Sequence, residues 1–270
     1  RLGFFKEVNV ETPSVAGTAD QVDVNFTVEE QPSGSISATV GFAEDTGLIL
    51  GLQYQESNVF GTGNSINIGI NRSDFQEALS FSFFDPYYTV DGVSRGYSFF
   101  FRKSDFGNFN IASFSTDSYG VSMNFGYPIS EVSRIGFSVG YENTNIKEGV
   151  IPAREISEFV DKEGNEFDLF SVTASYSMSA LNRGLLPTAG RSQSMSFEMT
   201  IPGSELEFYR INYSGQIFFP LWGPLVLRMR TDLGYGDAYG DTETFPFYKH
   251  FFAGGMGSVR GFESNTLGPR

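Results

Sequence analysis

The chain has 270 residues, of which 40% are hydrophobic, and its mean hydropathy is −0.16. No apolar run approaches the roughly 20 residues that a membrane helix requires. This excludes a helical span but not membrane strands, in which only alternate residues are apolar. The net charge of −14 argues against a nucleic-acid partner, because phosphate binding requires a basic surface. The chain contains no cysteine, so it offers neither a disulfide framework nor thiol chemistry.

The first 33 residues differ from the rest of the chain. Two alternating segments, Glu7–Glu11 and Val22–Glu29, predict two strands joined by a turn region at 13–20. Charged residues on their outer positions indicate a sheet that faces water. The run Gln31–Gly34 then predicts a short hinge.

From Gly34 onward, apolar residues alternate with small polar ones. Ile66, Ile68 and Ile70, for example, alternate with serine, asparagine and glycine. The alternating segments are about ten residues long, which is the reach of a tilted strand across a bilayer. The pattern predicts eleven strands, at 34–43, 47–56, 64–72, 77–85, 93–103, 117–127, 133–143, 167–180, 191–201, 206–219 and 224–236.

Alternation alone does not separate a soluble sandwich from a transmembrane barrel. Three features favour the barrel. The polar face repeats Ser, Gly, Asn and Thr with few Lys or Glu, as a lumen does. Aromatic residues gather at segment ends, where interfacial belts lie, and short turns alternate with longer connections. We therefore expect an all-β fold, a transmembrane antiparallel β-barrel whose apolar rows face lipid and whose first strand rises from the periplasm.

A glycine-rich aromatic stretch, 245–262, follows the last predicted strand. Its glycines permit positive φ or close approach to another surface, and its aromatic groups need something to pack against. We expect it to fold back into the lumen and to be held there by Arg260, because a buried guanidinium requires a partner. Alternation also turns four charged residues into the lumen, where they must pair or meet water: Glu198, Arg228, Arg230 and Asp232.

The residues do not indicate catalysis. The single histidine, His250, lies in an aromatic loop and is better explained by packing than by a catalytic role. No metal-ligand spacing and no phosphate-binding glycine motif appears, so we expect no enzyme, no cofactor and no metal site. The acidic connection around 153–166 has helical potential at Ala153–Val160, but a solvated charged loop is the favoured interpretation.

Several motifs together carry a resemblance to a known family. They are Phe252-Ala253-Gly254-Gly255, Val259-Arg260-Gly261-Phe262, and the runs at 85–94, 181–188 and 200–204. In combination they resemble the POTRA-barrel insertase superfamily, and within it the BamA family of outer-membrane protein assembly factors. Arg1–Phe5 and Asp20–Val24 are similar to the end of that family's last periplasmic POTRA domain, so the resemblance spans the chain.

The resemblance implies three parts: residues 1–33 as the C-terminal part of the last POTRA domain, an α+β domain; 34–236 as barrel strands 1–11; and 237–270 as the sixth extracellular loop, folding into the lumen. A complete barrel of the family has sixteen strands, and bacterial single-chain barrels have an even number. We therefore expect about five more strands after Arg270. Because the chain also begins at Arg1 without a signal peptide, we expect a mature segment or a piece of a longer protein.

The resemblance also implies a function. Members of the family insert β-barrel proteins into the bacterial outer membrane through a lateral gate at the first strand. The implied partners are unfolded outer-membrane proteins, the BAM lipoproteins, and outer-membrane lipid and lipopolysaccharide, with the N-terminal tail in the periplasm. In the family, the arginine that matches Arg260 contacts acidic residues on later strands; whether Glu198 or Asp232 substitutes for them is open. The gate strand is Ser35-Ile36-Ser37-Ala38-Thr39-Val40-Gly41-Phe42.

Two other classes stay open. A channel, either a porin or a two-partner secretion translocator, would share the alternating strands but needs an open lumen. An outer-membrane enzyme would need a base and a nucleophile, for which the residues give little support. On the residues alone, the first strand is equally that of any barrel.

Overall fold

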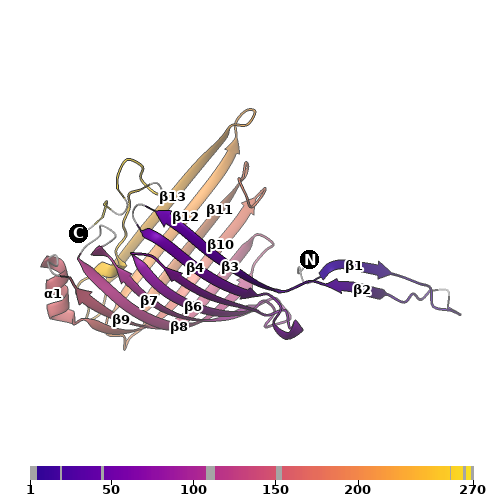
Figure 1. Ribbon diagram of the computed structural model, residues 1–270, viewed down its shortest axis with the longest axis horizontal. Helices are drawn as coiled ribbons and strands as arrows, with labels where there is room; N and C mark the ends of the chain where they lie inside the picture. Colours follow the sequence, from indigo (N-terminus) through magenta and orange to yellow (C-terminus); the bar gives the residue numbers. More distant parts are fainter. Residues whose placement is uncertain are drawn as a thin grey trace.

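The computed structural model describes residues 5–18, 20–43, 46–107, 113–149, 154–255, 257–263 and 266–268. Its strands form a two-stranded sheet near the N-terminus and an eleven-stranded sheet, both antiparallel (Figure 1). Within the described residues, no helix is both long enough and apolar enough to cross a membrane. The prediction of an all-β, antiparallel architecture is confirmed.

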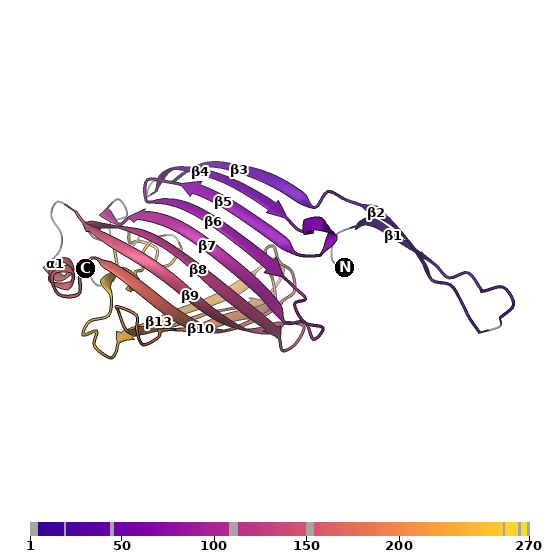
Figure 2. The same ribbon diagram turned by 90° about the horizontal axis from the view of Figure 1, so that it is seen from below.

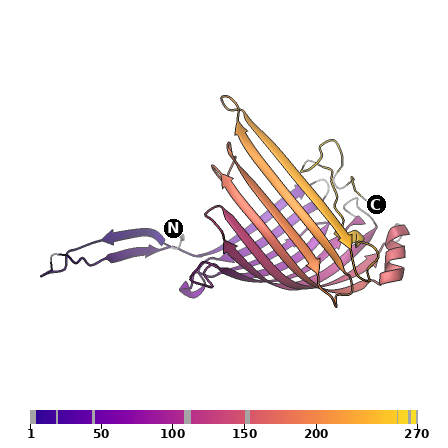
Figure 3. The ribbon, with the colours of Figure 1, turned by 180° about the vertical axis from the view of Figure 1, so that it is seen from behind.

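The large sheet keeps the order of the chain, from β3 at one edge to β13 at the other. It curves into a trough, with its edge strands β3 and β13 on different sides (Figures 2 and 3). Its strands are β3 (Gly34–Ala43), β4 (Gly47–Glu56), β5 (Ser65–Arg72), β6 (Gln76–Asp85), β7 (Ser94–Asp105), β8 (Phe114–Pro128), β9 (Ser133–Glu148), β10 (Glu166–Leu181), β11 (Gly190–Thr200), β12 (Phe208–Pro220) and β13 (Val226–Ala238).

All eleven predicted strands are present, and β3 and β4 have the predicted bounds. The largest departures from the predicted bounds are extensions of two strands: β8 begins at Phe114 rather than 117, and β9 ends at Glu148 rather than 143. At these ends the apolar residues change sides, so a search for unbroken alternation stops too early.

The two ends of the sheet differ. Since β3 follows the N-terminal hairpin, the turns at 57–64, 86–93, 129–132, 182–189 and 221–225 share the hairpin's end, here called the inner end. The opposite, outer end holds α1 (Arg154–Glu163) and the C-terminal segment (Figure 1). A short 3-10 helix, η1 (Val59–Gly61), lies in the first inner turn, and a second, η3 (Phe247–Lys249), lies in the C-terminal segment.

Burial in the wall of the sheet is opposite to that of a soluble protein. On β8, Thr116 and Ser118 are buried, whereas Tyr119 and Val121 are 43% and 51% exposed. The Ser118 hydroxyl forms a hydrogen bond of 3.0 Å with the hydroxyl of Thr144, which is also buried. A soluble sandwich would bury the apolar rows between two sheets. The observed sidedness, with small polar residues inside and apolar rows outside, is that of a barrel wall in lipid.

The outer end contains a compact apolar cluster, here called the outer cap. Phe247 of the C-terminal segment contacts Phe114 of β8 and Phe159 of α1, with ring centroids 4.8 and 5.2 Å apart. The prediction of a solvated loop at 153–166 is wrong. Ile156 and Phe159 lie on one face of α1 and are only 3% and 7% exposed. The buried residues of the cap are Phe114, Ile146, Ile156, Phe159, Phe167, Leu169, Leu206 and Phe208.

The N-terminal hairpin consists of β1 (Phe5–Glu11) and β2 (Asn25–Glu30) and extends away from the large sheet (Figures 1 and 2). Its cross-strand pairs Val8–Val28 and Val10–Phe26 make one apolar face. All residues of both strands are exposed. The assignment of residues 1–33 to a POTRA domain stays a prediction, and residues 1–4 of it lie outside the described chain.

Candidate functional site: an edge strand and a lumen loop

The predicted gate strand, Ser35–Phe42, lies within β3 at the edge of the sheet. Among the described strands β3 pairs only with β4, from Gly34 opposite Glu56 to Ala43 opposite Gly47. In an antiparallel pair, alternate residues direct their backbone N–H and C=O groups away from the partner. These groups form the free edge of β3. Among the outward apolar side chains of the wall, those of β3 are the most exposed: Ile36, Val40 and Phe42 are 74%, 76% and 79% exposed.

The strands next to this edge are short. β3 and β4 have ten residues each and β5 has eight, whereas β9 and β10 have sixteen. The pairing of β4 with β5 covers only Leu50–Glu56. A strand held by one short ladder separates from the sheet more easily than one held by two long ladders. The β3 side is therefore the more easily opened edge.

The opposite edge is covered on its inner face by the C-terminal segment, here called the lumen loop (residues 239–268). Its Phe245 lies over Gly236 of β13, and its Phe251 lies over Gly234. A Cβ atom at either glycine would stand 2.6 Å from the ring above it. The glycines thus make room for two aromatic rings against the polar face of the sheet, and the assignment of the segment to an extracellular loop that fills the lumen stays a prediction.

A partly buried ion pair joins the lumen loop to the wall. The Lys249 ammonium lies 3.1 and 3.3 Å from the two carboxylate oxygens of Glu142 on β9. The two side chains are 13% and 28% exposed. The neighbouring Tyr248 hydroxyl is buried without a hydrogen-bond partner among the described atoms, and burial raises the pKa of Tyr248. Sequence reasoning missed this pair, because 107 residues separate its members.

Arg260, expected to pin the loop, has no ion pair or hydrogen bond with any described residue. It is exposed, as are Val259, Gly261 and Phe262 around it. The turn that carries this motif is closed by its own backbone, since Gly255 N–H donates to the carbonyl of Phe262 over 2.9 Å. Its role as a pin stays a prediction, and Lys249 is the loop cation that reaches the wall.

The predicted lumen charges pair with neighbours on the sheet. Glu198 accepts from the Arg210 guanidinium at 2.7 Å, and Asp232 lies 2.6 Å from Arg230. Arg228 lies over the ring of Phe218, 5.7 Å from its centroid. Neither acid contacts Arg260, so the structure does not bring the four lumen charges together with the loop motif. Glu198 is thus balanced by a cation on the adjacent strand β12, and Asp232 by Arg230 on its own strand β13, as carboxylates in a lumen wall require.

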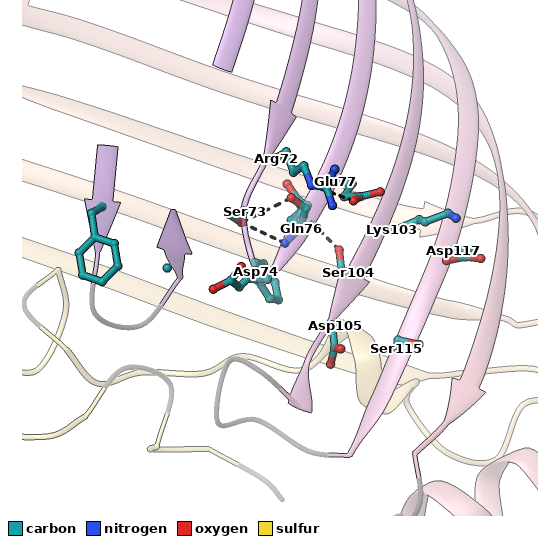
Figure 4. A pocket seen from close by; sticks show the side chains of 13 residues that line it. Arg72, Ser73, Asp74, Gln76, Glu77, Lys103, Ser104, Asp105, Ser115 and Asp117 are labelled. Carbon is teal, nitrogen blue, oxygen red and sulfur yellow. Dashed lines mark hydrogen bonds and ion pairs between the residues drawn. The ribbon is translucent and has the colours of Figure 1, made fainter. Parts of the chain in front are cut away.

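A polar cleft of about 740 Å³ opens at the outer ends of β5–β8 (Figure 4). Two ion pairs lie along it: Arg72 with Glu77 at 3.2 Å, and Asp117 with Lys147 at 2.5 Å. Gln76 donates to the Ser104 hydroxyl at 3.2 Å (Figure 4). The described residues contain no group of three or more His, Cys, Asp or Glu placed to hold a metal ion.

Several known proteins are similar to this chain in sequence. The model of the Omp85 superfamily domain matches residues 58–270. The chain belongs to the Omp85 superfamily. Over its full length it is 32% identical to the outer membrane protein assembly factor BamA of Neisseria meningitidis, of which it spans 35%. It is 26% identical, again over its full length, to the sorting and assembly machinery component 50 homolog A of Xenopus laevis, of which it spans 57%.

A solved structure agrees with this Omp85 assignment. The crystal structure of BamA from Haemophilus ducreyi lacking POTRA domains 1–3 superimposes with a TM-score of 0.87 at 27% identity, over 99% of this chain and 53% of that one. The resemblance to BamA inferred from the motifs is thereby confirmed. The chain spans about a third to a little over half of the relatives it matches.

Proposed function

We propose that the protein acts in the assembly of outer-membrane β-barrel proteins, as an insertase whose gate is the free edge of β3. Two relatives support assembly as the common theme: one is named an outer membrane protein assembly factor and the other a sorting and assembly machinery component. The observation that carries the gate is the shortness of the strands on this side of the sheet, with ten residues in β3 and β4 and eight in β5, against sixteen in β9 and β10.

The edge supplies the chemistry that insertion needs. An unfolded barrel strand can add to β3 through backbone hydrogen bonds, and this pairing accepts many sequences because it reads the main chain. The added client strand then directs its apolar side chains towards lipid and its polar ones towards the lumen, as β3 itself does. The proposed process uses no covalent step, so it requires no enzyme activity, cofactor or nucleotide at this site.

The proposed partners follow from the same edge and from the family. They are unfolded outer-membrane proteins on β3, outer-membrane lipid and lipopolysaccharide on the apolar wall, and the BAM lipoproteins on the periplasmic side. We place the barrel in the bacterial outer membrane with the N-terminal hairpin in the periplasm.

A disulfide tests the gate. The 270 residues contain no cysteine, so Ser37→Cys can be paired with one cysteine on the strand that closes the barrel against β3. Oxidation should block insertion of a client barrel into vesicles, and reduction should restore it. The matched control is Ser82→Cys on β6, which lies between two paired strands and cannot reach that position. Undiminished insertion after complete cross-linking would remove β3 from the mechanism.

A channel is the competing function. The rings of Phe245 and Phe251 on the inner face favour a filled lumen. Ion conductance through the reconstituted barrel, measured beside client insertion, separates the two functions. Insertion without steady conductance supports the insertase, whereas conductance without insertion supports the channel.

A further inference from the structure

The polar face of β11–β13 contains a hollow of about 360 Å³ near the inner end of the sheet. Three adjacent strands build it, because the register places Ser192 of β11 opposite Gln216 of β12, and Gln216 opposite Arg230 of β13. Arg228, two residues earlier on β13, turns to the same face. The described side chains that line the hollow carry two guanidinium groups, amides and hydroxyls, and none of them is a carboxylate.

A cationic hollow without an acid stands out in a chain whose net charge is −14. Arg210 and Lys249, which also face the interior, each contact a glutamate, at 2.7 and 3.1 Å. Arg228 forms no ion pair or hydrogen bond with any described residue; its guanidinium lies over the ring of Phe218, 5.7 Å from the centroid. A guanidinium has five N–H donors, so those of Arg228 are left for water or for a ligand that enters the hollow.

The neighbouring Arg230 is held in place from two sides. Its Nε lies 2.6 Å from the Asp232 carboxylate, and its Nη1 donates to the Gly257 carbonyl of the lumen loop at 3.5 Å. Asp232 in turn accepts a hydrogen bond of 2.7 Å from the Ser214 hydroxyl. An arginine fixed in this way presents its remaining N–H groups in one orientation, so little conformational freedom is lost when they bind an anion.

The neutral groups beside the two arginines are donors as well. The Gln216 amide donates to the Ser192 hydroxyl oxygen at 3.0 Å, which leaves the Ser192 hydroxyl hydrogen able to donate into the hollow. A carboxylate has two oxygens, and one bidentate arginine satisfies it. Donors that converge from three strands instead match the larger set of acceptor oxygens on a phosphate group.

We propose that this hollow binds a phosphate group, which Arg228 and Arg230 hold together with Ser192 and Gln216. Small-molecule pockets have volumes of about 300–1,000 Å³; the hollow lies at the lower end of that range, so its ligand is inorganic phosphate or a small phosphate ester. Because the hollow opens on the polar face and not on the apolar one, the ligand is a solute and not the headgroup of a bilayer lipid. The proposal requires only the arrangement of β11–β13, so it stands or falls separately from the insertase function.

Phosphorus NMR of inorganic phosphate tests the proposal on the whole protein, folded in a maltoside detergent that contains no phosphate. We expect the native protein to broaden the phosphate resonance saturably. Arg228→Gln should weaken the binding roughly tenfold, because hydrogen bonds from a charged donor are lost. The matched control is Arg191→Gln, which removes the same charge from the outward face of β11 and should leave the binding unchanged. Equal weakening by both variants overturns the proposal, since phosphate then responds only to net charge.

A second measurement guards against a variant that only perturbs the fold. Phosphate should raise the urea midpoint of the native protein and of Arg191→Gln by more than it raises that of Arg228→Gln, because a ligand stabilises the state that binds it. The absence of saturable broadening overturns the proposal; if Arg228→Gln then also has the lower midpoint without phosphate, a carboxylate of the protein itself fills the hollow. Displacement of phosphate by acetate at equal concentration also overturns it, since the hollow then recognises charge alone.

Discussion

The outer cap and the wall below it obey opposite rules of burial, although the same strands build both. In the cap, Phe167 and Leu169 of β10 are 1% and 3% exposed, as in the core of a soluble domain. In the wall, Ser118 and Thr144 are buried, whereas Phe99 and Val121 are 38% and 51% exposed. The difference teaches that the surrounding phase, and not the strand, decides which face is apolar. Where lipid surrounds the strands the apolar row turns outward, and where water surrounds them it turns inward.

The lengths of the strands show where the wall ends and the cap begins. β10 has 16 residues, so at about 3.3 Å per residue and a tilt of about 40° it rises roughly 40 Å. The apolar band of an outer-membrane barrel is about 25 Å tall. The ten residues of β3 rise only about 25 Å by the same geometry. The long central strands therefore continue out of the membrane and form the cap, whereas the gate strand just spans it.

The largest expected effect is the loss of a ring from the cap. Phe167→Ala removes a side chain that is 1% exposed and leaves a cavity, so it should lower the free energy of unfolding by about 3–5 kcal/mol. Phe170→Ala, three residues further on the same strand and 44% exposed, should cost about 1 kcal/mol. Urea titration of the two reconstituted variants measures both values. Equal losses would contradict the division into cap and wall.

The wall is tested by adding charge to each of its faces. Phe81→Arg places a guanidinium on the outward face in the middle of β6, which should cost about 2–4 kcal/mol near the bilayer midplane. Ser82→Arg, on the next residue, points to the polar interior and should cost less than about 1 kcal/mol. The yield of heat-modifiable barrel after folding into vesicles, with its urea midpoint, compares the two. If Ser82→Arg cost more stability than Phe81→Arg, the face that carries Phe81 would not be the one that contacts lipid.

The wall was predictable from the sequence because its signal is local. Alternation between neighbours such as Ile68 and Gly69 reports which face each residue takes, and it placed all eleven strands. The edge position of the Ser35–Phe42 strand also follows from chain order, since it is the first strand of the sheet.

The cap was not predictable, because its contacts join distant parts of the chain. Phe159, Phe208 and Phe247 meet only after α1, β12 and the lumen loop are in place. The acidic residues of α1 hid its apolar face, although Ile156 and Phe159 at a spacing of three were a signal that could have found it. The Lys249–Glu142 pair has no local signal at all.

That pair connects cap and wall and should give a moderate effect. Lys249→Met leaves the partly buried Glu142 carboxylate without its cation, at a cost of about 1–3 kcal/mol. The double variant Lys249→Met/Glu142→Met should recover most of the loss, because no unpaired charge is left behind. Urea midpoints and protease cleavage of the lumen loop are measured for both variants. If the double variant is no more stable than the single one, the pair does not hold the loop.

The smallest expected effect is a pH dependence of loop docking. His250 stacks on Phe245, 5.6 Å between centroids, and burial lowers the pKa of His250 below its ordinary value. A released loop therefore binds a proton more readily than a docked one. The contribution of His250 to docking is complete above pH about 6.5 and is lost as the pH falls through the lowered pKa. Intrinsic amide exchange slows as the pH falls from 7.5 to about 5, and a loop that opens more often at low pH offsets part of that slowing. Hydrogen exchange of residues 245–252 should therefore exceed, at the lower pH, the rate expected from the intrinsic pH dependence, and His250→Phe should remove that excess. An unchanged excess in His250→Phe would assign the pH dependence to another group.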